Sequence, residues 1–236
     1  MGVGLAIDPR ILSRLRTLSW LNQEQINRLA AEAALIRAMR GNSIFAEGDE
    51  STRIYILLSG AAKLQLIQNR EQRVLVGLLG PGEVFGLTSL LPQATRTFHC
   101  EAFTDCTAAA FKPEIFVDTV LGVPLDRASK MLEMTVGRWW SMIIRYSGFV
   151  GMGLRERLAG ALFEVASKFG VQDSRGTLVT LKLTHADLAE LVGASRQRTT
   201  EQLIEFEREG MIIRDGRRLV IVPDKIVEVA QPVAAA

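Results

Sequence analysis

The spacing of apolar residues changes twice along the chain, and each change marks a different kind of structure. Residues 9–36 carry apolar side chains at helical spacing, which predicts short helices. From about Ala38 to Phe111, short apolar runs end at glycine or other turn residues. These runs include 54–58, 63–67 and 74–79. Many short strands separated by turn signals favour an antiparallel barrel, roll or sandwich.

Residues 125–150 contain little glycine and no proline, which predicts a long helix. Apolar side chains repeat along it at alternating steps of four and three, as in a heptad seam. The seam consists of Ala128, Leu132, Thr135, Trp139, Met142, Tyr146 and Phe149. A second apolar stripe lies on an adjacent face and consists of Val136, Trp140, Ile143 and Val150. One face can pack on the strand domain, and the other needs a partner. A homodimer is the simplest prediction, and a single buried helix inside one domain is the alternative.

Three glycines, Gly148, Gly151 and Gly153, separate this helix from a second amphipathic helix predicted at 154–169. Glycine tolerates the dihedral changes that a hinge absorbs, so the cluster is a candidate hinge. A structural kink is the alternative. A polar stretch then leads into a strand that we predict at 178–183.

Residues 184–208 have the pattern of two short helices joined by a tight turn. Thr184 and Asp187 form a capping-box pattern, because a hydroxyl at the N-cap precedes a carboxylate by three residues. Gly193 follows the first helix, where a left-handed backbone residue is needed, and Ser195 can cap the second. The positions expected to face inward are Leu188, Leu191, Val192, Leu203 and Phe206, with small Ala189 at the crossing. This arrangement predicts a helix-turn-helix.

The charges of the second helix oppose the helix dipole at both ends. Arg196 and Arg198 occupy its first turn, and three glutamates gather near its end: Glu205, Glu207 and Glu209. A recognition helix presents its N-terminal residues to base edges in the major groove, which would explain the arginines. Arg196 is a candidate bidentate donor to guanine, and Gln197 could pair with adenine. Solvated surface arginines are the alternative.

The run from 211 to 222 predicts a β-hairpin that turns at Asp215 and Gly216. Such a hairpin would form a wing, and arginines beside its tip are candidate phosphate contacts. The predicted DNA-binding residues are therefore Ser195, Arg196, Gln197, Arg198, Thr200, Arg217 and Arg218.

Composition narrows the class of protein. The net charge is +2 over 236 residues, and basic and acidic residues are equal in number from Lys182 to Lys225, so DNA binding must depend on where charges are placed. No apolar run approaches the ~20 residues that span a bilayer, and the first residues lack a secretory signal pattern. We therefore expect a cytoplasmic protein with no membrane partner. Cys100 and Cys106 are too few for a disulfide framework or a four-thiolate metal site, so we expect no metal and no resident cofactor.

Three segments carry a resemblance to a known family. Leu191-Val-Gly-Ala-Ser-Arg196 resembles the residues that lead into the recognition helix in the Crp/Fnr family of bacterial transcription regulators. Residues 203–212 resemble the residues at the end of that helix. Residues 81–86, together with Arg96 and Thr97, resemble the phosphate-binding cassette of the cyclic-nucleotide β-roll. The resemblance covers nearly the whole chain, because the order of roll, long helix, hinge and winged helix-turn-helix is also that of the family.

The resemblance implies an α+β fold with three parts. These are N-terminal helices and an antiparallel β-roll sensor at 1–124, a dimerisation helix at 125–150, and a winged helix-turn-helix domain at 151–236. It implies a homodimer that binds double-stranded DNA and contacts RNA polymerase, and that is not an enzyme.

The cassette departs from the cyclic-AMP-responsive members of the family. Where they have a glutamate that accepts the ribose hydroxyl, this chain has Leu87, and their adenine-contacting Thr-Ser pair aligns with Met142 and Ile143. Each polar group left unpaired in a buried site costs about 1–3 kcal/mol, so cyclic AMP is not expected as the effector. The candidate effector pocket consists of Gly86, Leu87, Arg96, Thr97, Trp139, Met142, Ile143 and Tyr146. The aromatic and apolar members of this set could instead pack the dimer core.

Other sensor chemistries find little support. Fnr-like members hold an iron–sulfur cluster with several cysteines, and two cannot do so. His99 and Cys100 could ligate haem or a metal, but neighbours in a strand point to opposite faces.

The recognition helix departs from its family as well. Members that bind a TGTGA-like half-site carry Arg, Glu and a second Arg, whereas this chain has Arg196, Gln197 and Glu201. One guanine contact is therefore expected. Alternatives to an effector-controlled regulator are a cyclic-nucleotide-responsive regulator with a divergent pocket, a ligand-independent dimer, and a sensing module attached to an enzyme. The last is disfavoured, because the chain has no third domain, P-loop or nucleophile–base pair.

Overall fold

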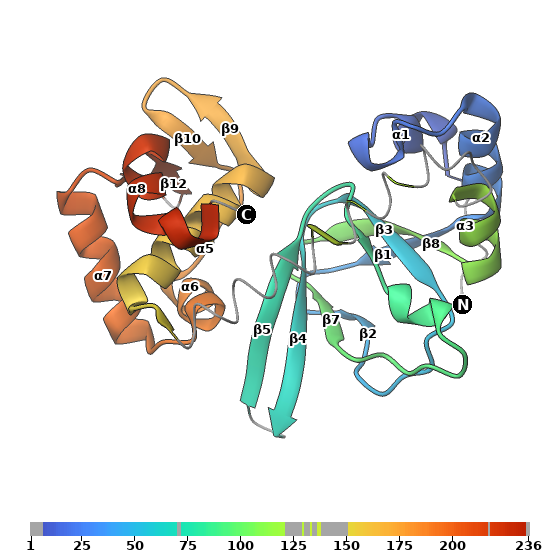
Figure 1. Ribbon diagram of the computed structural model, residues 1–236, viewed down its shortest axis with the longest axis horizontal. Coiled ribbons are helices and arrows are strands. Elements are labelled where there is room, and N and C mark those ends of the chain that lie inside the picture. The colour runs from blue at the N-terminus through green and yellow to red at the C-terminus, as the bar shows by residue number, and fades with distance from the viewer. Residues whose placement is uncertain are drawn as a thin grey trace. The chain divides into compact units, whose positions relative to one another are not determined.

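The computed structural model describes residues 7–69, 72–120, 129, 133, 136, 137, 151–216 and 218–234. The chain divides into two compact units, residues 1–136 and 137–236 (Figure 1). Within the described ranges, no helix has both the length and the apolar character that crossing a bilayer requires.

The first unit is built around two four-stranded antiparallel sheets, which confirms the predicted roll. One sheet has the order β1-β8-β3-β6 and the other β2-β7-β4-β5. The strands are β1 (Ala34–Ala38), β2 (Ser43–Phe45), β3 (Ile54–Ser59), β4 (Ala62–Asn69), β5 (Gln72–Leu79), β6 (Val84–Phe85), β7 (His99–Ala102) and β8 (Cys106–Phe111). Side chains from both sheets form one buried cluster, in which Phe45, Tyr55 and Phe85 contact one another through their rings.

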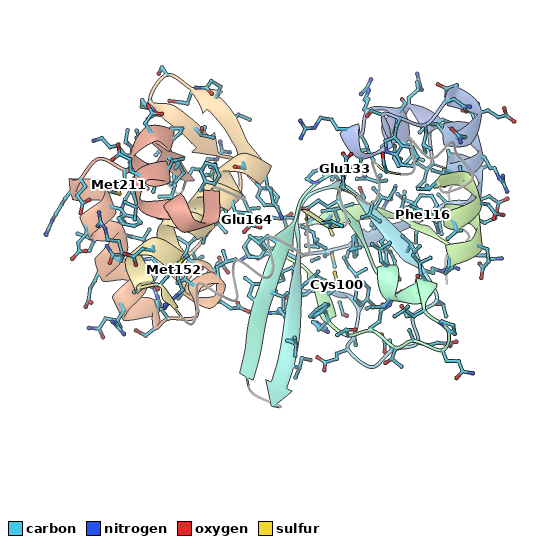
Figure 2. The ribbon with its side chains drawn as sticks, in the orientation of Figure 1. Cys100, Phe116, Glu133, Met152, Glu164 and Met211 are labelled. Carbon is cyan, nitrogen blue, oxygen red and sulfur yellow. The ribbon has the colours of Figure 1, made fainter. Side chains whose placement is uncertain are left out.

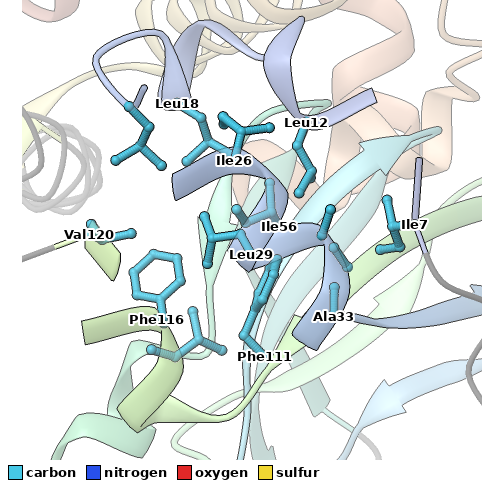
Figure 3. Packing of buried hydrophobic residues seen from close by; sticks show 14 of the residues in the cluster. Ile7, Leu12, Leu18, Ile26, Leu29, Ala33, Ile56, Phe111, Phe116 and Val120 are labelled. Carbon is cyan, nitrogen blue, oxygen red and sulfur yellow. The ribbon is translucent and has the colours of Figure 1, made fainter. Parts of the chain in front are cut away.

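Short helices cover the outer face of the first sheet (Figure 3). They are α1 (Pro9–Ser13), the 3-10 helix η1 (Arg16–Leu18), α2 (Gln23–Glu32) and α3 (Pro113–Val120). Their apolar faces bury Leu12, Ile26, Leu29 and Phe116 against Phe111 of β8. The segment from Ala34 to Ala38, predicted as the end of a helix, is a strand.

The strand forms because its backbone finds a partner far along the chain. Leu35 pairs with Ala109 of β8, in a register that runs from Ala34 opposite Ala110 to Ala38 opposite Cys106. The helical spacing that ends at Leu35 in the sequence cannot reveal a partner some seventy residues away.

The second unit packs helices around an antiparallel sheet of order β11-β12-β10-β9 (Figure 1). Its elements are α5 (Leu154–Phe169), β9 (Gly170–Asp173), β10 (Gly176–Val179), α6 (His185–Val192), α7 (Arg196–Arg208), β11 (Ile212–Asp215), β12 (Arg218–Ile221) and α8 (Pro223–Ala234). The bounds of α5 confirm the helix predicted at 154–169. Figure 2 labels Met152 just before α5, Glu164 within α5 and Met211 just before β11.

The polar stretch before β10 is part of a hairpin, which the sequence pattern missed. Strand β9 pairs with β10 from Gly176 opposite Asp173 to Val179 opposite Gly170, so the strand predicted at 178–183 begins and ends earlier. Gly176 has φ +146°, and a Cβ there would lie 2.3 Å from the carbonyl oxygen of Ile221. Glycine is needed at this position because β10 and β12 approach each other closely.

The predicted long helix falls almost entirely outside the described residues. Ser129, Glu133, Val136 and Gly137 are helical, and Val136 is 62% exposed in the single chain. The heptad seam and the glycine hinge residue Gly148 lie outside the described residues.

Candidate DNA-binding and effector sites

The helix-turn-helix is fixed by the local signals that the sequence predicted. The backbone N–H of Asp187 donates to the Thr184 hydroxyl (3.1 Å), and the backbone N–H of Thr184 donates to the Asp187 carboxylate (2.8 Å). Gly193 ends α6 in the left-handed conformation at φ +60°. Ser195 caps α7 by accepting from the backbone N–H of Arg198 (3.3 Å). The capping box, the glycine turn and the second cap are all confirmed.

Helices α6 and α7 pack through the predicted apolar positions, all of them buried: Leu188, Leu191, Val192, Leu203 and Phe206. Ala189 is 5% exposed, and its carbonyl accepts from the N–H of Ala194 in the turn. Thr199 is fully buried as well, and its hydroxyl donates to the carbonyl of Ser195 (3.0 Å). These contacts determine which face of α7 packs against α6.

The opposite face of α7 is exposed at its start. Arg196, Gln197 and Arg198 are all exposed, and no acidic side chain lies in the first turn. Among the described residues, neither Arg196 nor Arg198 forms an ion pair. The N-terminal turn of α7 therefore presents positive charge that nothing in the described structure neutralises.

The carboxylates near the end of α7 have partners within the unit, which the sequence analysis did not foresee. Glu207 pairs with Arg214 of β11 (2.8 Å). Glu209 pairs with both terminal nitrogens of Arg155 in α5 (2.9 and 2.6 Å), which lowers the pKa of Glu209. The Arg155 guanidinium also lies over the ring of Phe206 (5.2 Å to the centroid). These pairs offset the unfavourable placement of the charges along the helix dipole.

His185 joins α6 to the recognition helix, a role that the sequence analysis missed. Its Nδ1 lies 2.8 Å from the Thr200 hydroxyl, and that hydroxyl donates to the Arg196 carbonyl (2.8 Å). Because a hydroxyl has a single hydrogen, the imidazole donates through Nδ1–H. Burial lowers the pKa of His185, and the nearby Arg214 and Arg196 lower it further. The sequence feature that could have indicated this role is the position of His185 at the first residue of α6, directly after the N-cap Thr184.

The wing turns where the sequence predicted. Asp215 pairs with Arg218 across the hairpin, and Gly216 has φ +60°. Arg218 is exposed, and Arg217 lies outside the described residues. Arg175, in the turn between β9 and β10, forms an ion pair with Asp215 (2.8 Å) and so braces the wing.

In the roll, Arg96 is buried and engaged on several sides. Its side chain donates from Nη1 to the carbonyl of Gly86 (3.0 Å) and from Nη2 to the carbonyl of Arg53 (2.7 Å). The guanidinium carbon lies 4.5 Å from the Phe45 ring centroid and 5.3 Å from that of Tyr55. Its Nε is buried without a partner, and burial lowers the pKa of Arg96. Both terminal nitrogens are thus bonded to the protein's own backbone.

The other residues of the predicted effector pocket differ in where the structure places them. Gly86 has φ +78°, and a Cβ there would lie 2.7 Å from Nη1 of Arg96, so the two positions are coupled. Leu87 packs against the apolar cluster of the N-terminal helices, and Thr97 is exposed. The remaining four, Trp139, Met142, Ile143 and Tyr146, lie outside the described residues.

The cysteines lie in the apolar interior of the roll. Cys100 and Cys106 are both buried, and burial raises the pKa of the Cys100 thiol far above its usual value (Figure 2). Cys100 belongs to the inner cluster, whereas its neighbour His99 lies near Glu101 (3.9 Å), so the two do point to opposite faces. The described residues contain no group of three or more potential metal ligands.

Taken together, the fold and the exposed basic turn of α7 define a winged helix-turn-helix protein joined to a sensor-type β-roll. Residues 35–121 match the cyclic nucleotide-binding domain, and residues 156–225 match the Crp-like helix-turn-helix domain. The chain is 30% identical over 189 residues to the global nitrogen regulator of Synechocystis, covering 79% of this chain and 83% of the relative. The chain belongs to the Crp/Fnr family of DNA-binding transcription regulators and is not an enzyme.

Further similarities agree with this assignment. The chain is 26% identical over 211 residues to the CRP-like cAMP-activated global transcriptional regulator of Mycobacterium tuberculosis, covering 89% of this chain and 94% of the relative. The solved structure of FixK2 from Bradyrhizobium japonicum has the same fold, with a TM-score of 0.70 at 19% identity, covering 84% of this chain and 96% of the other.

Proposed function

We propose that the protein is a homodimer that binds a specific DNA sequence through the N-terminal turn of α7. The observation that carries this proposal is the exposed Arg196 at the start of a doubly anchored recognition helix. The Arg196 carbonyl accepts a hydrogen bond from the Thr200 hydroxyl, and that hydroxyl accepts one from His185. Ser195 caps the helix. Arg196 would contact guanine and Gln197 adenine.

Phosphate contacts would surround these two base contacts. Ser195 and Arg198 at the start of α7 would make such contacts, and so would Arg217 and Arg218 of the predicted wing. Thr200 would support them indirectly, because its hydroxyl donates to the Arg196 carbonyl. Contacts of this kind set the register of the protein on the duplex without selecting a sequence. DNA affinity should therefore fall steeply as salt rises.

Dimerisation through the helix at 125–150 would place two recognition helices on neighbouring half-sites, about 34–36 Å apart. The operator would then be a palindrome or nearly so. We further propose that the protein acts in the cytoplasm, where it meets its DNA, and that it contacts RNA polymerase there.

We infer that the effector is not cyclic AMP. Arg96 is buried, and two of its five N–H donors bond to backbone carbonyls of the roll, so its side chain has a structural role there without a phosphate. Leu87 offers no acceptor for a ribose hydroxyl, since its side chain is hydrocarbon. The alternative is a cyclic-nucleotide-responsive regulator with a divergent pocket, which the match of residues 35–121 to that domain favours.

DNA binding is tested by fluorescence anisotropy with duplexes from the promoter region upstream of the protein's own gene. The Arg196→Ala variant should lose roughly 5- to 150-fold in affinity for the specific duplex, because a bidentate arginine–guanine contact contributes about 1–3 kcal/mol. Lys168→Ala is the matched control, since it removes a positive charge from α5 that pairs with Glu164. Unchanged binding by the Arg196 variant would remove α7 from the interface. Calorimetry with cyclic AMP should give no heat of binding, and saturable binding would favour the alternative.

A further inference from the structure

Glu201 lies at the centre of the exposed face of α7. At about 100° per residue, Gln197, Glu201 and Arg208 project away from the buried Leu203 and Phe206. Glu201 follows Gln197 by one turn on the same face, so it lies in the N-terminal half of α7, the part of a recognition helix that contacts base edges. A carboxylate here would face a polyanion, which is an unfavourable position unless it has a specific partner.

Gln197 orients the Glu201 carboxylate. Its Nε2 donates to Oε1 of Glu201 (3.0 Å). Since a carboxylate only accepts hydrogen bonds, this contact also fixes which end of the Gln197 amide faces it. The second oxygen of Glu201 and the carbonyl oxygen of Gln197 are therefore both acceptors on the exposed face. The second Nε2 hydrogen of Gln197 is still available, so its contact with adenine is compatible with this arrangement.

Glu201 also differs from Glu207 and Glu209, the two carboxylates at the end of the helix. Those two form ion pairs with Arg214 and Arg155. In the part of the chain that the structure describes, no basic side chain forms an ion pair with Glu201. Its charge is left for a partner outside the protein.

We propose that Glu201 determines sequence specificity by accepting a hydrogen bond from the N4 amino group of a cytosine, near the guanine contacted by Arg196. Cytosine presents a lone donor in the major groove, whereas guanine presents two acceptors that repel a carboxylate. Adenine places its N7 acceptor beside its amino group, which makes it a poorer partner. Glu201 thus selects cytosine and also rejects guanine, and rejection is as important for specificity as attraction. Gln197 acts as a positioning residue for this contact.

The inference rests on the proposed DNA binding, and one experiment separates the two. The full-length protein selects duplexes from a randomised half-site library, which are then sequenced. The wild-type protein should enrich cytosine over guanine about tenfold or more at one position, the discrimination expected of a good base contact. Glu201→Gln should abolish that preference at this position alone, because an amide can both donate and accept. Gln197→Ala should weaken the preference at the same position.

A second glutamine–glutamate pair on the same helix supplies the control. Gln202 donates to Glu205 (2.8 Å), away from the centre of the exposed face. Glu205→Gln should therefore leave the selected sequence unchanged. If the wild-type protein enriches no sequence, the proposed DNA-binding function fails. If it enriches a sequence that Glu201→Gln also enriches unchanged, DNA binding stands and the role of Glu201 is wrong.

Discussion

Replacement of Arg96 tests whether this residue stabilises the fold of the roll or serves to bind a ligand. Its guanidinium links the turn at Gly86 to the backbone of Arg53 and covers the rings of Phe45 and Tyr55. In the Arg96→Ala variant both carbonyls lose a charged donor, and a cavity opens beside the rings. We expect the roll to be markedly less stable.

The magnitude follows from the two bonds. A hydrogen bond to a charged group contributes about 1.5–3 kcal/mol. The desolvation of the guanidinium, which also lowers the pKa of Arg96, offsets part of the gain from two such bonds. A net loss of about 3 kcal/mol is expected, a large share of the 5–15 kcal/mol that stabilises a typical protein. Arg96→Lys should give an intermediate loss, because an ammonium lacks the planar fork that reaches both carbonyls.

Urea unfolding followed by the fluorescence of Trp20 suits this test, since Trp20 packs against the apolar cluster of the first unit. Trp139 and Trp140 are replaced by phenylalanine in every protein compared. The matched control is Arg37→Ala, which removes an exposed arginine from β1 of the same roll and should change stability by less than about 0.5 kcal/mol. An Arg96→Ala protein that unfolds at the same urea concentration as this control would refute the structural role. Arg96 would then be free to bind an anion, and the argument against cyclic AMP would lose its main support.

Two further predictions concern the DNA-binding unit. Thr184→Ala removes the hydroxyl of the α6 capping box and should lower the free energy of unfolding by about 1 kcal/mol, measured by hydrogen exchange of the α6 amides; exchange at the wild-type rate would show that the cap contributes nothing. Because the pKa of His185 is lowered in the folded state, the unfolded chain binds a proton more readily, and stability should fall as pH drops below the ordinary value of 6.5. His185→Asn should reduce this loss in urea titrations between pH 7.5 and 5.5, with His99→Asn as the comparison, and an unaltered pH dependence would contradict the assignment.

The sequence by itself determined the features that depend on neighbouring residues. Thr184 with Asp187, Gly193 and Ser195 specify helix ends through contacts within a few residues, so their pattern is visible in the chain. The wing turn at Gly216 has the same local origin. The order of such elements was enough to predict a roll followed by a winged helix-turn-helix.

Only the tertiary structure decided features that join distant segments. The strand at Ala34–Ala38 exists because β8 supplies its hydrogen-bond partners, and helical spacing cannot reveal them. The status of Arg96 is of the same kind. The family resemblance made it a candidate phosphate ligand, and the fold bonds two of its five N–H donors to the carbonyls of Arg53 and Gly86, forty-three and ten residues away. Hydrogen bonds between residues close in sequence can be predicted from the sequence. The partners of a buried charged side chain lie far away in the sequence and are known only from the tertiary structure.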